Sequence, residues 1–299
     1  MALNSPRNFK PIASLRMAAL NFSPPMIGLS LCFGLIFFLY LPVLISLLGN
    51  WIKDPDFSHG FIVAPVSIYL AWQKRSELKT PASPNNWGLP ILVLGLILFF
   101  LGGLAAEIFT QRFSLLIVIA GTVLFLFGKH HLKTLAFPIA FLIFMIPLPS
   151  ILLQKITLPM QLFASGCAYH MLDFWAIPAI REGNVLYLPN VTLNVAEACS
   201  GIRSLISLIT LATLLAHFKN KALWQRLLII FSTIPIAIFV NAFRVFLTAF
   251  LSYHFGAGVA KGLLHESAGL VLFLVAAIIL YGFSALMDRI RNWELGIRN

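Results

Sequence analysis

The chain has 299 residues, of which 60% are hydrophobic and only 10% are charged, and its mean hydropathy is +0.92. A soluble domain carries about 25% charged residues, so this composition excludes a soluble globular protein and indicates a polytopic membrane protein. The net charge of +11 would also suit a nucleic-acid-binding protein, but its distribution along the chain favours a membrane.

The first half of the chain consists of apolar segments separated by short polar loops. Residues 1–25 are polar and basic, and we predict that they form a cytoplasmic N-terminus. The run over residues 26–48 has about the 20 apolar residues that a bilayer span needs. Four further spans are predicted at residues 60–72, 88–106, 113–128 and 134–148.

The second half begins with a long region that we do not expect to span the membrane. Residues 151–175 are predicted to form an amphipathic helix at the membrane interface. Residues 184–188 and 191–195 alternate around a Pro-Asn turn, which indicates a small β-hairpin. The last three spans are predicted at residues 201–218, 227–251 and 265–287.

The predicted fold is therefore an all-α integral membrane protein with about eight transmembrane helices, a short amphipathic helix and a small β-hairpin before span six. We expect one polytopic domain over residues 26–287 and a basic cytoplasmic tail over residues 288–299. With both termini inside, most of the 21 basic residues lie on the cytoplasmic face, as the positive-inside rule requires. This explains the net charge without nucleic acid, and it places the hairpin and the starts of spans six and eight at the outer face.

The polar stretch before span six ends at a cysteine. Glu197, Cys199 and Ser200 stand directly before Gly201, which opens the apolar segment. A helix N-terminus favours the thiolate, the nucleophilic form of cysteine, and Arg203 adds positive potential one turn further on. A buried, inert cysteine at a loop–helix junction explains this stretch alone equally well.

Two more polar residues are predicted at the outer face. Arg244 lies inside the span over 227–251, about 10 Å below its outer end, where a charge costs at least about 2.5 kcal/mol. His265 begins the last span beside Glu266, and Asn241 lies one turn before Arg244, where it could hold the guanidinium. Snorkelling of the arginine and helix capping by the histidine are the alternatives.

Cysteine, histidine and arginine together form a minimal set for cleaving and transferring an amide. A thiolate attacks the carbonyl, and an imidazole takes the thiol proton and later protonates the leaving amine. A fixed guanidinium stabilises the negative oxygen of the tetrahedral intermediate. The three cysteines of the chain form no CxxC pair and show no metal-ligand spacing, so we predict neither a metal nor a cofactor.

These motifs resemble those of the exosortase/archaeosortase family of membrane protein-sorting enzymes. The resemblance covers roughly residues 30–290 and rests on Ala-Glu-Ala-Cys-Ser-Gly-Ile-Arg-Ser over 196–204, Asn-Ala-Phe-Arg over 241–244, His-Glu-Ser-Ala-Gly over 265–269 and Ser-His-Gly-Phe-Ile-Val-Ala-Pro-Val-Ser over 58–67. It implies a cysteine transpeptidase or protease with Cys199 as nucleophile, His265 as acid/base and Arg244 as oxyanion stabiliser.

The resemblance also implies the substrates and the location. They are secreted proteins whose C-terminal tail has a short motif, often Pro-Glu-Pro, then a transmembrane helix and a basic cluster. The enzyme would cut near the motif and pass the acyl group to water, an amine or a glycan or lipid acceptor, on the outer side of the inner membrane of a Gram-negative bacterium that makes exopolysaccharide. We expect lateral docking of the tail helix, with Tyr187, Leu188 and His59 near the motif.

Three other functions stay open on the sequence alone. A transporter would use Arg244 to bind its substrate. A membrane acyltransferase would share Cys199 but form a lipid thioester. A non-catalytic subunit of an exopolysaccharide export system would tolerate Cys199→Ala. The sorting enzyme is favoured because it explains three motifs in their order and on one face.

Overall fold

The structure is a computed structural model that describes residues 24–195, 201–218, 222–256, 258 and 263–294. Side chains are described from residue 32 onward, and in the last helix over residues 269–291. By its internal contacts the chain divides into two units, residues 1–45 and 46–299. The division falls within the first helix, α1 (Pro24–Lys53).

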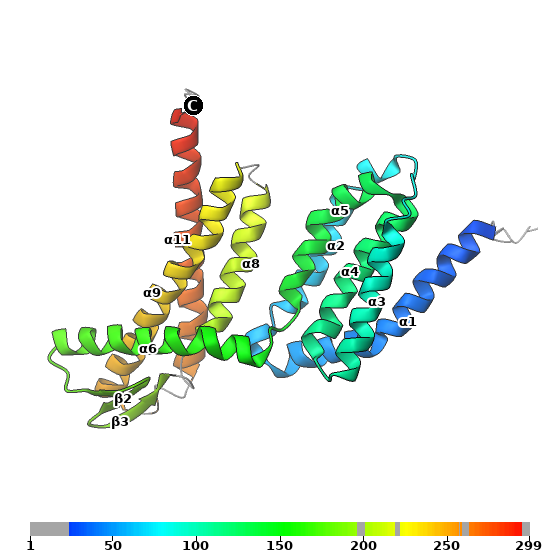
Figure 1. Cartoon of the computed structure of the whole chain (residues 1–299). Coiled ribbons are helices and arrows are strands. Elements are labelled where there is room, and N and C mark those ends of the chain that lie inside the picture. Colours follow the sequence, from blue (N-terminus) through cyan, green and yellow to red (C-terminus); the bar gives the residue numbers. More distant parts are fainter. Residues whose placement is uncertain (1–23, 196–200, 219–221, 257, 259–262, 295–299) are drawn as a thin grey trace, which may run out of the picture. The chain divides into compact units, whose positions relative to one another are not determined.

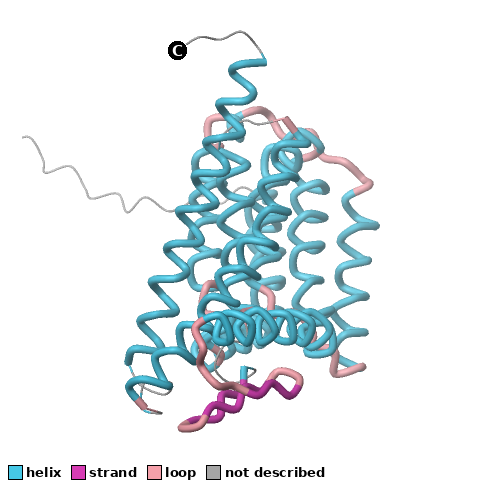
Figure 2. Tube along the Cα trace, turned by 90° about the vertical axis from the view of Figure 1, so that its left-hand side faces the viewer, coloured by secondary structure: helices cyan, strands magenta, loops and turns pink. Residues whose placement is uncertain are grey.

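Helices make up most of the described chain (Figures 1 and 2). After α1 come α2 (Gly60–Gln73), α3 (Gly88–Leu104), α4 (Ile108–Phe127) and α5 (Lys129–Phe141), with short 3-10 turns η1 (Pro55–Phe57), η2 (Glu77–Lys79) and η3 (Leu142–Met145). Then follow α6 (Ser150–Phe174), α8 (Ile202–Phe218), α9 (Leu223–Phe255) and α11 (Leu263–Glu294). The predicted helix over 151–175 is confirmed by α6.

The described residues contain four helices that are long and apolar enough to cross a membrane, at Cys32–Lys53, Ile108–Phe127, Leu223–Phe255 and Gly269–Arg291. A fifth arises if the residues of α5, η3 and α6, bent by 76°, form one broken or re-entrant span. With 14 residues in α2 and 17 each in α3 and α8, these helices are only about 21–26 Å long, against about 30 Å of hydrocarbon. The multi-pass helical architecture is therefore confirmed, but the predicted eight spans are not.

The α3–α4 hairpin is built on close approach at glycines. Gly88, Gly95 and Gly102 recur every seven residues and so share one side of α3. A Cβ at Gly95 would lie 2.6 Å from Val118 Cγ2, and one at Gly102 would lie 2.7 Å from the backbone nitrogen of Gln111. Small residues let membrane helices approach in this way, so that dispersion contacts hold them together.

Three strands follow α6. β1 (Ile180–Glu182), β2 (Val185–Leu188) and β3 (Val191–Asn194) form an antiparallel sheet in chain order. The predicted hairpin is confirmed in β2 and β3, which pair Leu186 with Leu193 and Leu188 with Val191. β1 is an additional strand, whose three residues are all exposed.

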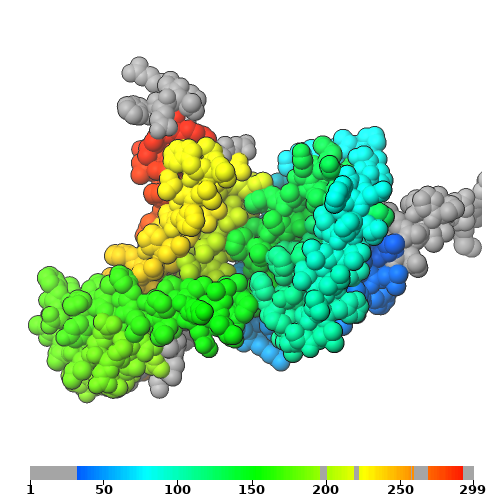
Figure 3. All heavy atoms as spheres, in the orientation of Figure 1, coloured from blue at the N-terminus to red at the C-terminus, as the bar shows by residue number. Residues whose placement is uncertain are grey.

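Two hydrophobic cores share α9. The first joins α6 (Ala164, Ala168, Leu172), the sheet (Leu186, Leu188, Leu193) and the C-terminal part of α9 (Ala242, Val245, Phe246, Ala249). The second joins α8 (Leu205, Leu208, Ala212), the N-terminal part of α9 (Ile229, Ala237, Val240) and α11 (Leu272, Ala276, Leu280). In Figure 1 α6 crosses α9, and in the space-filling view (Figure 3) α6 and the strands form one continuous surface.

We predict that Gly102→Ala will separate α3 from α4 and destabilise the protein by about 1–3 kcal/mol, the usual result of overpacking. The matched control is Gly103→Ala, because a Cβ there meets only the flexible end of Gln111, Nε2 at 3.3 Å. Both changes gain the same helix propensity, so the difference in thermal midpoint in detergent isolates the packing. Equal midpoints for the two variants would contradict the prediction.

Candidate active site

The predicted nucleophile belongs to the connection between β3 and α8. β3 ends at Asn194, and α8 begins at Ile202. Glu197, Cys199 and Ser200 lie outside the described residues, and their roles stay predictions. The covalent chain nevertheless limits the distance between Cys199 and Gly201, because two peptide units span at most about 7 Å.

Gly201 lies against the side chain of Asn241 in α9. Its φ is +71°, in the region that strains residues with a Cβ. A Cβ at this position would also lie 3.0 Å from Asn241 Nδ2 and 3.1 Å from its Cγ. Asn241 itself is only 4% exposed. Position 201 therefore requires glycine for two reasons, the positive φ of its backbone and the close approach of the Asn241 amide. This approach joins the cysteine motif to the Asn-Ala-Phe-Arg motif.

Arg244 lies against the third motif. A Cβ at Gly269 of α11 would be 3.2 Å from one terminal nitrogen of the Arg244 guanidinium and 3.4 Å from its Cζ. Position 265 is one helical turn before Gly269 on the same face of α11. The side chains of His265 and Glu266 lie outside the described ones, so the acid/base role of His265 and the supporting role of Glu266 stay predictions.

Asn241 and Arg244 lie where the two cores meet along α9. Val240 belongs to the core with α8 and α11, whereas Ala242 and Val245 belong to the core with α6 and the sheet. α9 continues to Phe255, so Arg244 is about 16 Å from the end of the helix, further than the sequence predicted. Among the described residues no hydrogen bond joins Asn241 to Arg244, and the amide faces Gly201.

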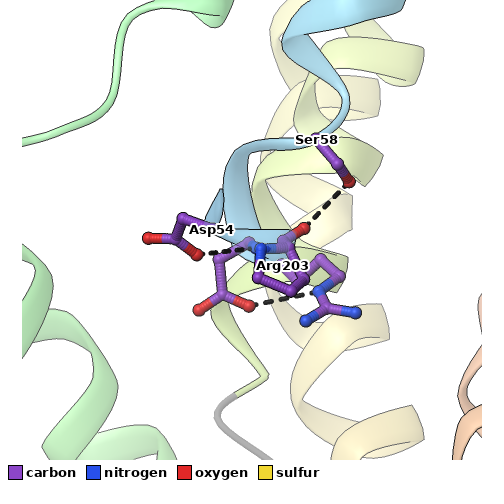
Figure 4. A network of polar contacts seen from close by, with 5 residues as sticks. Asp54, Ser58 and Arg203 are labelled. Carbon is purple, nitrogen blue, oxygen red and sulfur yellow. Dashed lines mark hydrogen bonds and ion pairs between the residues drawn. The ribbon is translucent and has the colours of Figure 1, made fainter. Parts of the chain in front are cut away.

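Arg203 is paired across the fold with an acidic loop (Figure 4). Its Nε donates to Asp56 Oδ1 at 3.1 Å. The Asp56 backbone nitrogen donates to Asp54 Oδ1 at 2.9 Å, and Ser58 Oγ donates to the Pro55 carbonyl at 2.9 Å. The positive potential predicted for Arg203 is therefore balanced by a carboxylate 147 residues away in the chain. Sequence reasoning missed this partner, although two aspartates in so apolar a chain are a signal.

His59 has a partner within the protein. Its Nε2 donates to the carbonyl of Phe144 at 3.0 Å, and nearby Trp51 Nε1 donates to the carbonyl of Met145 at 2.9 Å. Burial lowers the pKa of His59 below its usual value, against the opposing effect of its hydrogen bonds to backbone carbonyls. The hydrogen bond to Phe144 ties His59 to η3, and a contact between His59 and substrate stays a prediction.

The two strand residues predicted to bind substrate point to opposite faces of the sheet, because side chains alternate along a strand. Leu188 is 8% exposed and belongs to the core with α6 and α9. Tyr187 is 39% exposed and lies opposite the exposed Thr192 of β3. The geometry therefore presents Tyr187 outward and uses Leu188 for packing.

We predict that Asp56→Asn will speed the alkylation of Cys199 by iodoacetamide at neutral pH. The change leaves the charge of Arg203 unbalanced four residues after Cys199 in the sequence, and a nearby positive charge favours the thiolate. Since the ion pair is partly exposed, with side chains 55% and 29% accessible, the effect should be a few-fold at most. The double variant with Arg203→Gln should return to near the wild-type rate, and an unchanged rate in Asp56→Asn would contradict the prediction.

Comparison with known families identifies the chain. Residues 51–282, more than half of its length, match the family described as transmembrane exosortase (Exosortase_EpsH). No curated protein and no solved structure matches the chain. The matched range contains Asp56 and His59 as well as the three motifs that the contacts at Gly201 and Gly269 bring together. The chain belongs to the transmembrane exosortase family.

Proposed function

We propose that Cys199, Arg244 and His265 form the catalytic centre of a cysteine transpeptidase that removes the C-terminal sorting tail of secreted proteins. Family membership implies a sorting transpeptidase that acts on proteins with Pro-Glu-Pro C-terminal tails. The observation that carries the assignment of residues is the pair of contacts Gly201–Asn241 and Arg244–Gly269. Through them, three motifs that are far apart in sequence are tied to neighbouring positions in the fold.

The proposed reaction has two half-reactions. The Cys199 thiolate attacks the carbonyl carbon of the scissile amide, a C–S bond forms, and the π electron pair moves to the oxygen. Arg244 stabilises that negative oxygen. When the oxygen reforms the carbonyl, the C–N bond breaks and protonated His265 gives its proton to the leaving amine. An acceptor, which loses a proton to His265, then attacks the thioester and releases the thiolate.

We propose that this centre faces the outer side of the plasma membrane, where secreted proteins pass. Basic residues gather in the α2–α3 and α8–α9 connections and at the end of α11, away from the connection that carries Cys199. The positive-inside rule assigns such segments to the cytoplasm. Arg75 stacks at 3.9 Å over the ring of Trp72 at the end of α2, an arrangement that suits the membrane–water interface. The tail helix of the substrate would then dock laterally from the bilayer.

We expect that Cys199→Ala, Arg244→Ala and His265→Ala will each leave a tail-bearing secreted protein at full length. The measurement is co-expression of enzyme and substrate, followed by gel electrophoresis and mass spectrometry of the new C-terminus, which separates hydrolysis from transfer. Cys167→Ala, which changes a half-buried cysteine of α6, is the control and should process normally. Tail removal by a stably inserted Cys199→Ala variant would show that Cys199 is not the nucleophile and would favour a transport or assembly role.

Tyr187→Ala should weaken capture of the substrate motif while the protein stays folded, because the ring is exposed and contributes little to the core. We expect slower processing at low substrate levels and a normal thermal midpoint. Leu188→Ala should instead lower the midpoint, since truncating a buried leucine costs about 2–5 kcal/mol. Tyr69→Ala, an exposed tyrosine on α2 (51%), is the control. If Tyr187→Ala processes the substrate as fast as this control does, the sheet does not form part of the binding cleft.

A further inference from the structure

We infer that Asn241 is a further catalytic residue, whose side-chain amide donates a hydrogen bond to the carbonyl oxygen of the scissile bond as negative charge develops on it. The inference deepens the proposed function and rests on it for the identity of the natural substrate. The proposed catalytic centre would then have a neutral hydrogen-bond donor, Asn241, in addition to the positive charge of Arg244.

The first observation is a buried donor that the protein does not use. Asn241 is 4% exposed, and its Nδ2 has no hydrogen-bond partner in the part of the chain that the structure describes. An unsatisfied buried amide donor destabilises the folded protein, so such a group calls for an explanation. By contrast, Thr233, a fully buried polar residue two turns earlier on α9, bonds to the Ile230 carbonyl at 2.6 Å.

The second observation is the position of this donor. Its nitrogen is the atom closest to the place where a Cβ of Gly201 would lie, at 3.0 Å. Only two peptide units separate Gly201 from Cys199, so the chain holds the nucleophile within about 7 Å of that glycine, measured between Cα atoms. Arg244, one turn further along α9, lies on the same face of the helix. The amide therefore lies against Gly201, on the face of α9 that also carries Arg244.

The chemistry needs such a donor in the transition state and not before it. As the thiolate forms the C–S bond, the π electrons of the carbonyl move to oxygen, and a donor fixed in a water-poor site stabilises that oxygen. A group that bonds to nothing in the resting enzyme and to the oxyanion during reaction favours the transition state over the ground state. If Asn241 only supported Gly201, its loss would disturb Cys199 itself and would slow every reaction of the thiol alike.

The experiment compares two reagents that both consume the Cys199 thiolate. p-Nitrophenyl acetate reacts through a tetrahedral intermediate with a negative oxygen and releases p-nitrophenolate. Iodoacetamide reacts by displacement of iodide from carbon, without an oxyanion. Rates at Cys199 are measured by absorbance and by the mass of the labelled peptide, and the Cys199→Ala protein subtracts labelling at Cys32 and Cys167.

We expect Asn241→Leu, which has nearly the same shape and no charge, to slow acylation about tenfold or more while alkylation stays within about twofold. Removal of an oxyanion donor lowers kcat by about 10²–10³ in a protease, and an activated ester needs less help. Asn241→Ala provides a second variant with a smaller side chain. Thr233→Val is the matched control for loss of a buried polar group on α9 and should change neither rate.

Three results would overturn the inference: equal slowing of both reactions, no slowing of either, or a wild-type Cys199 that is alkylated but not acylated. Failure of the proposed function is separate, because it appears as wild-type enzyme that leaves the sorting tail intact. Selective slowing of acylation in that case would keep Asn241 as the oxyanion donor of a cysteine enzyme with another acyl substrate.

Discussion

The packing of α9 between two hydrophobic cores is the constraint on which the candidate site depends. Its N-terminal part packs with α8 and α11, and its C-terminal part packs with α6 and the sheet. Where one set of neighbours gives way to the other, α9 carries Asn241 and Arg244. Burying a polar group without a partner is costly. Asn241 and Arg244 stand between the residues of the two cores, so their polar side chains interrupt the packing of neither core.

The residues of the candidate site could be proposed from the sequence because they stand in short motifs, and their roles stay predictions. The cysteine motif, Asn241 to Arg244 and His265 to Gly269 each stand out as polar residues in apolar segments. The β2–β3 hairpin was predictable from alternation and a Pro-Asn turn, whereas β1 was missed because Ile180–Glu182 is exposed throughout and shows no alternation of burial. The eight predicted spans are not confirmed because the apolar segments of α2, α3 and α8 form helices that are short for a bilayer span.

The sequence signals polar residues in distant segments but does not say which of them meet. Nothing in the residues near Arg203 indicates that its partner is Asp56, and the alternation that suggested Tyr187 and Leu188 does not tell which faces a core. The structure resolves both points and changes the electrostatic interpretation. Arg203 is balanced by Asp56. Among the described residues, Arg244 is the cation that lies against Gly269 of the His-Glu-Ser-Ala-Gly motif. If the proposed roles hold, the positive charge near the acyl oxygen belongs to α9 and not to the helix that follows the cysteine motif.

The hydrogen bonds of Trp51 and His59 also have a consequence for biogenesis. Their acceptors in η3 lie 94 and 85 residues later in the chain, and the cation that pairs with Asp56 lies 147 residues later. During synthesis the end of α1 and the start of α2 are therefore made before any of these partners. Until those partners are made, the indole, the imidazole and the carboxylate lack the hydrogen bonds that they have in the folded protein. The ion pair between Asp56 and Arg203 can form only after the start of α8 has been made, so it is the last of the three contacts to become possible.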